Sequence, residues 1–299
     1  MKGENDTPKD NTTMKVHLDC IPCFLRQALQ AARFATDDRE KHEEVLRTAL
    51  TIIDRSSWHA TPSEIGQSVH LSVMDVLGNN DPYRDEKIRS NEIVLAMYGE
   101  LQREIERADD PVNAAIRFSI AGNIMDYGAK AEFNIHETLV RVAAETFRID
   151  SSHELEEDFK HATTIAYLVD NAGEIVFDRL LMETVDWVYG EKEWHVFVKS
   201  HPIINDATMD TAIHAGLNGR RNVLLDVVRF SHEHDDRTDP PFLERLATHD
   251  VVISKGQGNF EAMSEVKGVN LYFLLMAKCF IVSDDLGVDT GDLLVIKKS

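Results

Sequence analysis

Residues 163–188 read TTIAYLVDNAGEIVFDRLLMETVDWV. The opening part, TTIAYLVD, is an apolar run rich in β-branched and aromatic residues, and Asn171 and Gly173 follow it. Such a run is typical of a buried strand. From Glu174 onward the apolar residues recur at intervals of three and four, which predicts an amphipathic helix. The stretch therefore predicts a strand that turns directly into a helix.

This alternation continues to the C-terminus. We predict further strands over 194–200, 222–228, 251–256, 271–278 and 293–298, with helices over 207–216, 241–249, 259–267 and 279–286. Strands that alternate with helices form a parallel sheet with both faces covered. The fold class is therefore α/β, and residues 151–299 are expected to form a three-layer α/β/α domain with a mainly parallel sheet.

The N-terminal half has a different pattern. Residues 23–35, 39–54 and 91–108 repeat apolar positions at helical spacing, and convincing strand patterns are absent there. We therefore expect a helical domain over residues 14–150. The first 13 residues, MKGENDTPKDNTT, are polar and are predicted to be a disordered tail.

Charge and cysteine content exclude several classes of protein. The chain has 32 Lys and Arg against 52 Asp and Glu, a formal net charge of −20. This balance argues against binding to a nucleic-acid backbone or to an anionic membrane. No apolar run reaches the ~18 residues of a membrane span. Three cysteines are too few for a secreted disulfide framework, so we expect a cytoplasmic protein. The sequence carries no indication of its oligomeric state.

Polar side chains follow the first two predicted strands. Asp170 and Asn171 come directly after the first strand, and Asp206 lies in the loop after the second. Ligands bind at the carboxyl ends of parallel strands, and carboxylate and amide oxygens suit Mg²⁺ or Mn²⁺. Asp170 and Asn171 are also good helix N-caps, so a purely structural role is the alternative.

The third strand end carries a lysine and glycines. Lys255 follows the apolar run VVIS and precedes Gly256, where backbone amides could form an anion site. A solvated lysine in an ordinary turn is the alternative. The segment lacks the glycine–lysine spacing of a nucleotide-binding P-loop.

Cys20 and Cys23 form a CxxC motif after a short segment, KVHLD, that is a possible strand. A redox pair would normally belong to a thioredoxin-like unit, which the following pattern does not provide. A zinc site would need further ligands, for which Cys279 and His17 are candidates. Free thiols without a metal are the third possibility.

Six motifs, in order, resemble the metal-dependent phosphatases known as domain of unknown function eighty-nine, or damage-control phosphatases: CIPCFLRQAL, DPYRDEKIRSN, AGNIMD, DNAGEIVFD, INDAT and SKGQGNFE. The CxxC motif is similar to that of the archaeal and bacterial branch. One segment departs from the family pattern, because residues 224–239 read LLDVVRFSHEHDDRTD where a glycine-containing turn is expected.

The resemblance implies hydrolysis of small phosphorylated metabolites with a divalent metal such as Mn, Mg, Co or Ni. It implies that Asp170, Asn171 and Asp206 are the metal ligands. It also implies a phosphate-side role for Lys255 and an acidic role for Glu174. Residues of the AGNIMD motif are implied to face the site and bind substrate; they are Asn123 and Asp126.

The sequence therefore predicts a metal-dependent phosphatase for sugar- or cofactor-like phosphates. Catalytic roles are expected for Asp170, Asp206, Lys255 and Glu174, and Gly256 is expected beside the substrate. A carboxyl methyltransferase using S-adenosylmethionine is one alternative, although no glycine-rich nucleotide loop follows the first strand. A non-catalytic metal- or redox-sensing protein built on the CxxC is another.

Overall fold

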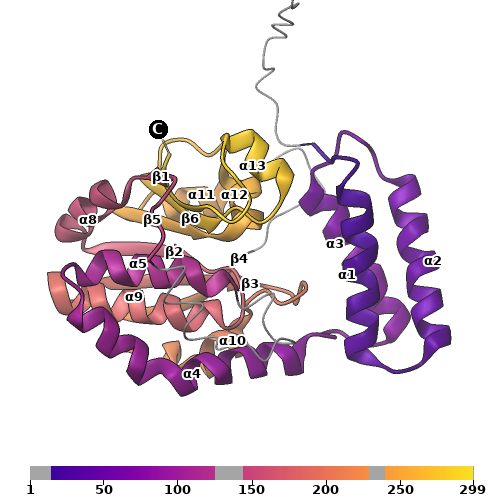
Figure 1. Ribbon diagram of the computed structural model, residues 1–299, viewed down its shortest axis with the longest axis horizontal. Helices are drawn as coiled ribbons and strands as arrows, with labels where there is room; N and C mark the ends of the chain where they lie inside the picture. Colours follow the sequence, from indigo (N-terminus) through magenta and orange to yellow (C-terminus); the bar gives the residue numbers. More distant parts are fainter. Residues whose placement is uncertain (1–14, 125–143, 229–239, 299) are drawn as a thin grey trace, which may run out of the picture.

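A computed structural model gives the fold and describes residues 15–124, 144–228 and 240–298 (Figure 1). A twisted sheet lies between two layers of helices, and a separate group of three helices stands beside the sheet (Figure 1). The predicted fold class is confirmed: helices dominate the N-terminal part, and strands and helices alternate in the C-terminal part.

Within the described residues, seven strands form one sheet in the order β1-β7-β6-β5-β2-β3-β4. The strands are β1 (Ile149–Asp150), β2 (Thr164–Leu168), β3 (Glu193–Lys199), β4 (Val223–Val228), β5 (Val251–Lys255), β6 (Leu271–Met276) and β7 (Leu293–Lys297). Neighbouring strands run parallel, except that β6 and β7 are antiparallel. Every residue of β5 and β6 is buried, as expected for inner strands whose two faces are both covered.

Helices cover both faces of the sheet. One layer contains α4 (Arg84–Arg107), α5 (Pro111–Ala121), η1 (Gly122–Ile124), α8 (Ser152–His161), α9 (Glu174–Tyr189), α10 (Met209–His214) and η2 (Leu217–Gly219). The other contains α11 (Pro240–Leu246), α12 (Gly256–Met263) and α13 (Phe280–Leu286). Each layer packs a hydrophobic core of its own against the sheet, and the larger core includes Ile116, Phe177 and Tyr167.

The three helices beside the sheet form a small bundle, which we call the helical module: α1 (Cys20–Ala35), α2 (Arg39–Arg55) and α3 (Pro62–Leu77). Phe24, Val45 and Val69 contribute to its own hydrophobic core. A capping box fixes the start of α3, where Thr61 Oγ1 accepts from the Glu64 amide at 3.2 Å and Glu64 Oε2 accepts from the Thr61 amide at 2.6 Å.

Several local expectations change in the structure. The possible strand KVHLD is not a strand, since its residues lead directly into α1. The two-residue strand β1 was not predicted from the sequence. The larger core also crosses residue 150, because α4 and α5 pack on α9. The division of the chain at residue 150 stays a prediction, as does the disordered tail, which lies outside the described residues.

None of the helices in the described part of the chain is both long enough and apolar enough to cross a membrane.

Candidate active site at the carboxyl edge of the sheet

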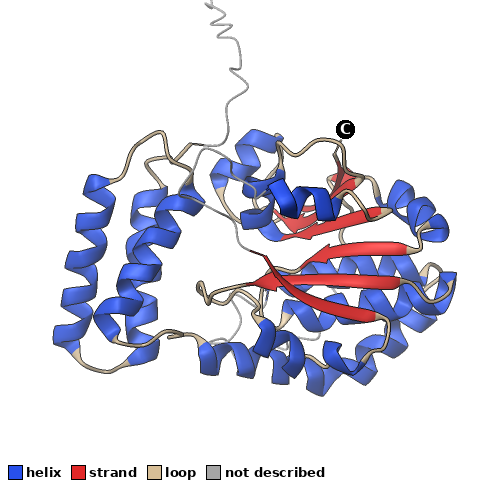
Figure 2. Ribbon diagram, turned by 180° about the vertical axis from the view of Figure 1, so that it is seen from behind, coloured by secondary structure: helices blue, strands red, loops and turns tan. Residues whose placement is uncertain are grey.

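Three neighbouring strands end at the same edge of the sheet. β2 pairs with β3 on one side and with β5 on the other, all in parallel. Their arrowheads point toward the helical module (Figure 2). The polar side chains that follow these three strands are therefore brought to one edge of the sheet, and this edge faces the helical module.

The loops after β2 and β3 are joined by backbone contacts. Asn171 and Asp206 form an isolated antiparallel bridge. The Ala207 amide donates to the Asp170 carbonyl at 2.8 Å, and the Ala172 amide donates to the Asn205 carbonyl at 2.9 Å. The predicted metal ligands Asp170, Asn171 and Asp206 thus lie side by side on two paired segments.

The side chains of Asp170 and Asn171 interact directly. Asn171 Nδ2 donates to Asp170 Oδ2 at 2.7 Å, and both residues are buried. Neither of them caps the following helix, because α9 has Gly173 at its N-cap and no side-chain cap bond. The capping alternative considered from the sequence is therefore not what these side chains do.

Gly256 stands against the Asp170 carboxylate. A Cβ atom on Gly256 would lie 1.9 Å from Asp170 Oδ2, and the glycine has φ of +77°. Both features require glycine at this position. The close approach brings the first residue of α12 to the end of β2, where backbone amides at a helix N-terminus favour an anion.

The edge concentrates negative charge. Burial raises the pKa of Asp170 well above its ordinary value, and the carboxylates of Glu174 and Asp206 raise it further. Lys278 and Lys199 oppose this increase. A site that crowds carboxylates away from water is chemically suited to a cation, which would offset their mutual repulsion.

Lys255 lies beneath this edge in a buried ion-pair network. Its Nζ atom donates to Glu174 Oε1 at 2.7 Å, to Asp178 Oδ1 at 2.6 Å and to the Ser119 carbonyl at 3.0 Å. Lys255 has no exposed surface, so it is not the solvated turn residue considered as an alternative. Its predicted contact with a substrate phosphate stays a prediction, while its ammonium is satisfied here by protein oxygens.

Glu174 connects the network to the edge. Its Oε2 atom accepts a long hydrogen bond from Asn171 Nδ2 at 3.4 Å, while its Oε1 atom holds Lys255. Burial raises the pKa of Glu174, and the Lys255 ammonium opposes that effect. Burial alone would lower the pKa of Lys255, but the carboxylates of Asp178 and Glu174 raise it above its ordinary value.

Asn123 occupies η1, next to α9. Its side chain is 1% exposed, and its buried Oδ1 atom has no hydrogen-bond partner among the residues that the structure describes. Gly122 allows η1 to approach α9, since a Cβ atom there would lie 2.5 Å from the Phe177 ring. An unpaired buried carbonyl oxygen is costly unless a ligand satisfies it. The companion residue Asp126 lies outside the described residues.

Sequence reasoning missed the residues that position these loops. Asn91 on α4 accepts from the Gly173 amide at 2.7 Å and donates to the Thr211 carbonyl at 3.0 Å. His70 on α3 accepts from the Ile204 amide at 3.1 Å. Asn91 belongs to the DPYRDEKIRSN motif, which was the available signal, whereas nothing in the sequence pattern distinguished His70.

Lysines at two other strand ends were also missed. Lys199, the last residue of β3, donates to Asn259 Oδ1 at 2.5 Å, and Asn259 donates to the Val169 carbonyl at 3.0 Å and the Lys255 carbonyl at 2.8 Å. Lys278 follows β6 and acts on both Asp170 and Glu174. Their position after a strand, the criterion applied to Lys255, would have identified both.

The chain's cysteines lie near one another at the junction of α1 and α13. All three are free. Burial raises the pKa of the Cys20 thiol, and the neighbouring thiols of Cys279 and Cys23 act in the same direction. Gln257 Nε2 donates to Cys279 Sγ at 3.4 Å. Cys20 begins α1, and the thioredoxin-like strand that a redox CxxC requires does not precede it.

The oxygen set at the edge fits a hard divalent cation. In the ranges that the structure describes, no three His, Cys, Asp or Glu side chains are grouped so that they alone could hold a metal. Two carboxylates and one amide, from Asp170, Asp206 and Asn171, instead match the sparse protein ligation of Mg²⁺ or Mn²⁺. Such ions complete their coordination with water and with substrate phosphate oxygens.

The fold and the edge together define a three-layer α/β protein with an oxygen-rich ligand site at the carboxyl ends of parallel strands. Residues 16–294 match the damage-control phosphatase ARMT1-like domain. The chain therefore belongs to this family, as its six motifs predict.

Individual relatives agree with this assignment. The chain is 32% identical to an uncharacterised protein of Methanocaldococcus jannaschii, MJ0202, over 96% of each chain. It is 31% identical to damage-control phosphatase PH1575 of Pyrococcus horikoshii over 95% of this chain and 98% of that one. The crystal structure of the Pyrococcus horikoshii protein superposes with a TM-score of 0.83 at 30% identity, covering 96% of this chain and 100% of that chain.

Proposed function

We propose that this chain is a metal-dependent phosphatase that hydrolyses small phosphorylated metabolites. Membership of the damage-control phosphatase family supports a phosphatase in general terms. The observation that carries the metal dependence is the meeting of Asp170, Asn171 and Asp206 on bridged segments at the carboxyl edge. Three protein side chains leave the other coordination positions of a divalent cation open to water and to the substrate.

Oxygen atoms of Asp170, Asn171 and Asp206 would hold the divalent cation. When bound, such a cation supplies charge neutralisation for the phosphate and lowers the pKa of a water molecule that attacks phosphorus. The remaining task of the chain is to bind the phosphate dianion and keep it oriented. A phosphomonoester needs this electrostatic help more than it needs a covalent nucleophile.

Positive and dipolar groups surround the proposed phosphate position. Helix α12 begins at Gly256, beside the Asp170 carboxylate, and no side chain of the described residues caps its first amides. Lys278 and Lys199 bring positive charge to the edge, since both act on Asp170. Asn123, whose Oδ1 atom has no partner among the described residues, is proposed to bind a substrate hydroxyl. Asp126 is proposed to assist it.

Lys255 and Glu174 are proposed to support the phosphate site through Asn171, from the buried side of the edge. Lys255 donates to Glu174, and Glu174 accepts from Asn171, so the ammonium neutralises the carboxylate that orients the Asn171 side chain. In this arrangement Glu174 is a positioning residue for Asn171. A direct contact between Lys255 and the substrate phosphate would require the ammonium to leave the two carboxylates that now hold it.

The first experiment measures hydrolysis of p-nitrophenyl phosphate with Mn²⁺, Co²⁺, Ni²⁺ or Mg²⁺, and again with excess chelator. We expect turnover that depends on the metal and falls to background for Asp170→Asn. Asp54 is exposed on α2, far along the chain from the edge, so Asp54→Asn makes the same charge change and should retain full turnover. Turnover that survives the chelator would disprove the metal dependence.

The same assay separates the alternatives. A Cys20→Ser/Cys23→Ser variant should keep its phosphatase activity, because hydrolysis at a hard-metal site needs no thiol. Bound zinc without turnover, lost in that variant, would favour a sensor built on the CxxC. Transfer of a methyl group from S-adenosylmethionine without phosphate release would favour the methyltransferase.

A further inference from the structure

Helix α1 carries positive charge and no acidic residue, although the molecule as a whole is acidic. The helix reads CIPCFLRQALQAARFA and contains two arginines but no Asp or Glu, although the chain as a whole has 52 acidic against 32 basic residues. Arg26 and Arg33 are both exposed. Within residues 15–124, 144–228 and 240–298, neither guanidinium belongs to an ion pair.

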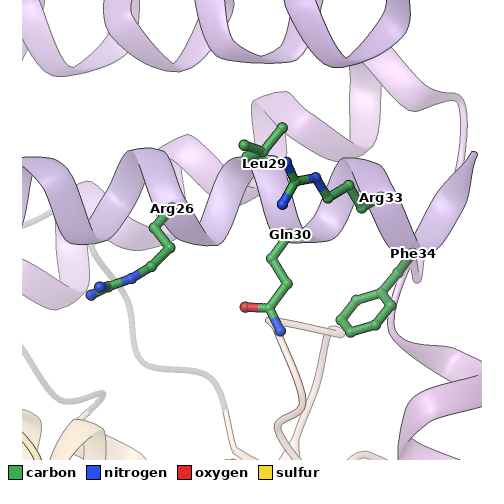
Figure 3. A pocket seen from close by; sticks show the side chains of 5 residues that line it. All are labelled: Arg26, Leu29, Gln30, Arg33 and Phe34. Atoms are coloured by element: carbon green, nitrogen blue, oxygen red, sulfur yellow. The ribbon is translucent and has the colours of Figure 1, made fainter. Parts of the chain in front are cut away.

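These arginines line a cavity of ≈ 450 Å³ together with Leu29, Gln30 and Phe34. Figure 3 shows Arg26, Gln30 and Phe34 extending from the same side of α1. The volume lies within the range of small-molecule sites. The lining combines two guanidinium groups, one amide and two apolar side chains, which suits an organic molecule with an anionic end.

The cavity lies on the side of the helical module that meets the candidate active site. The Phe34 ring packs on Tyr83 with centroids 5.0 Å apart, and Tyr83 packs on His70 at 5.9 Å. His70 in turn accepts from the Ile204 amide at 3.1 Å, in the loop that leads to Asp206. This loop, salmon in Figure 1, extends from β3 toward α1. Stacked rings and one hydrogen bond therefore connect the wall of the cavity to the loop that carries Asp206.

We propose that α1 carries a second anion-binding subsite, in which Arg26 and Arg33 bind a carboxylate or phosphate at the end of the substrate remote from the scissile phosphate. The proposal rests on the phosphatase function proposed above and names its substrate class as phosphorylated metabolites with a second anionic group. Guanidinium groups form paired, charge-assisted hydrogen bonds with both anions. Gln30 is placed to bind a hydroxyl group between the two ends.

The test compares three glucose-derived substrates that differ at C1. Glucose 6-phosphate has no second anion, 6-phosphogluconate has a carboxylate, and glucose 1,6-bisphosphate has a phosphate. We expect the wild type to prefer the doubly anionic compounds. In Arg26→Gln/Arg33→Gln, the ratio of kcat/KM for a doubly anionic substrate to that for glucose 6-phosphate should fall about ten- to a hundredfold. The carboxylate and phosphate arms show which anion the subsite prefers.

A matched control removes two arginines elsewhere in the helical module. Arg39 and Arg55 are exposed on α2, outside the cavity lining, so Arg39→Gln/Arg55→Gln makes the same change in net charge. This variant should keep the wild-type ratio. An equal fall in both double variants would indicate a general effect of charge and overturn the subsite.

Calorimetric titration of 6-phosphogluconate in the presence of chelator adds a readout that is independent of turnover. Binding should weaken at least about tenfold in Arg26→Gln/Arg33→Gln and be unchanged in the α2 control. If metal-dependent hydrolysis occurs but neither the ratio nor the binding responds to the α1 arginines, the subsite alone is wrong. If the wild type hydrolyses no phosphate ester, the proposed function fails, and an unchanged titration would then reject the subsite as well.

Discussion

Lys255 shows how far the environment of one residue can depart from its setting in the sequence. It follows a predicted strand and precedes a glycine, and this position predicts a lysine in a turn that faces a ligand. Instead its ammonium is fully buried between Glu174 and Asp178. Asp178 Oδ1 also accepts from Tyr167 and Ser119, at 2.8 Å each, so one carboxylate oxygen serves three donors. The residue is the centre of a polar network within the core.

Replacing Lys255 should therefore destabilise the fold before it affects chemistry. Lys255→Met leaves two carboxylates buried without their cation, which typically costs about 3–5 kcal/mol. We expect that loss in the free energy of unfolding measured by denaturant titration. Adding Glu174→Gln and Asp178→Asn to the same chain should restore part of the stability, because the uncompensated charges are then removed.

Lys278 provides the comparison for this variant. It is partly exposed and acts on Asp170 from the rim of the site. Lys278→Met should change the free energy of unfolding by less than about 0.5 kcal/mol, while kcat/KM falls about tenfold or more through loss of a charge-assisted contact to phosphate. Wild-type stability with reduced activity in Lys255→Met would instead show that Lys255 itself meets the substrate.

At the scale of the elements, α3 holds the loop after β3 in an unusual conformation. Ile204 has φ of +46°, the only positive value at a non-glycine among the described residues, and its amide donates to His70. Its side chain packs against the core of the helical module. A strained residue two positions before Asp206 is thus fixed by contacts from another part of the chain.

This contact makes stability depend on pH. Burial lowers the pKa of His70 to about 4, with Asp81 opposing and Lys87 assisting the decrease. Because the ordinary pKa is 6.5, protonation below that value favours the unfolded chain. The contribution of His70 is therefore complete above pH 6.5 and is lost as the pH falls toward 4. At pH 5 the loss is about 2 kcal/mol.

Unfolding of the wild type and His70→Gln across pH 4 to 8 measures this contribution as a difference between two curves. The difference should grow toward high pH, where neutral His70 supports the loop. His59→Gln changes an exposed histidine of the same module and should follow the wild-type curve. Parallel curves for wild type and His70→Gln would contradict the prediction.

The elements that could be predicted from sequence are those whose signal is local. The ends of β2, β3 and β5 follow from apolar runs that stop at polar residues, so the sequence could predict that Asp170, Asp206 and Gly256 lie at one edge of the sheet. Strand direction is not encoded in periodicity, and the antiparallel pairing of β7 with β6 was not anticipated. His70 and Asn91 were missed because their importance depends on which helix meets which loop.

At the scale of the whole molecule, the helical module meets the α/β part where α3 packs against α12. Glu261 on α12 lies in this contact. Burial raises its pKa to about 7, and a hydrogen bond from the Ser63 backbone partly opposes the increase. Cys20, at the start of α1, lies close enough for Glu261 to raise the pKa of its thiol as well. The junction thus contains an acid that titrates near neutral pH.

The junction should weaken as the pH rises through that value. A raised carboxyl pKa adds stability that is complete below the ordinary value of 4.5 and is lost as the pH rises through about 7. Glu261→Gln removes this loss, so at pH 8 it should be more stable than the wild type by about 1–3 kcal/mol. Denaturant unfolding at pH 5 and pH 8 measures the change. Glu265→Gln, on the turn that follows α12, should leave the pH dependence as in the wild type.

The contacts that build the edge also determine how late it can form while the chain is synthesised and folds. Asn91 holds the Gly173 amide across 82 residues, Lys255 reaches Glu174 across 81, and Lys255 reaches the Ser119 carbonyl across 136. Contacts of such sequence separation close late in folding, because each must first overcome the entropy of a long loop. On a translating ribosome, the three helices of the module are complete early, whereas the edge waits for residue 255 to emerge. The nascent chain therefore remains without the assembled edge, and with its larger core unfinished, for most of its synthesis.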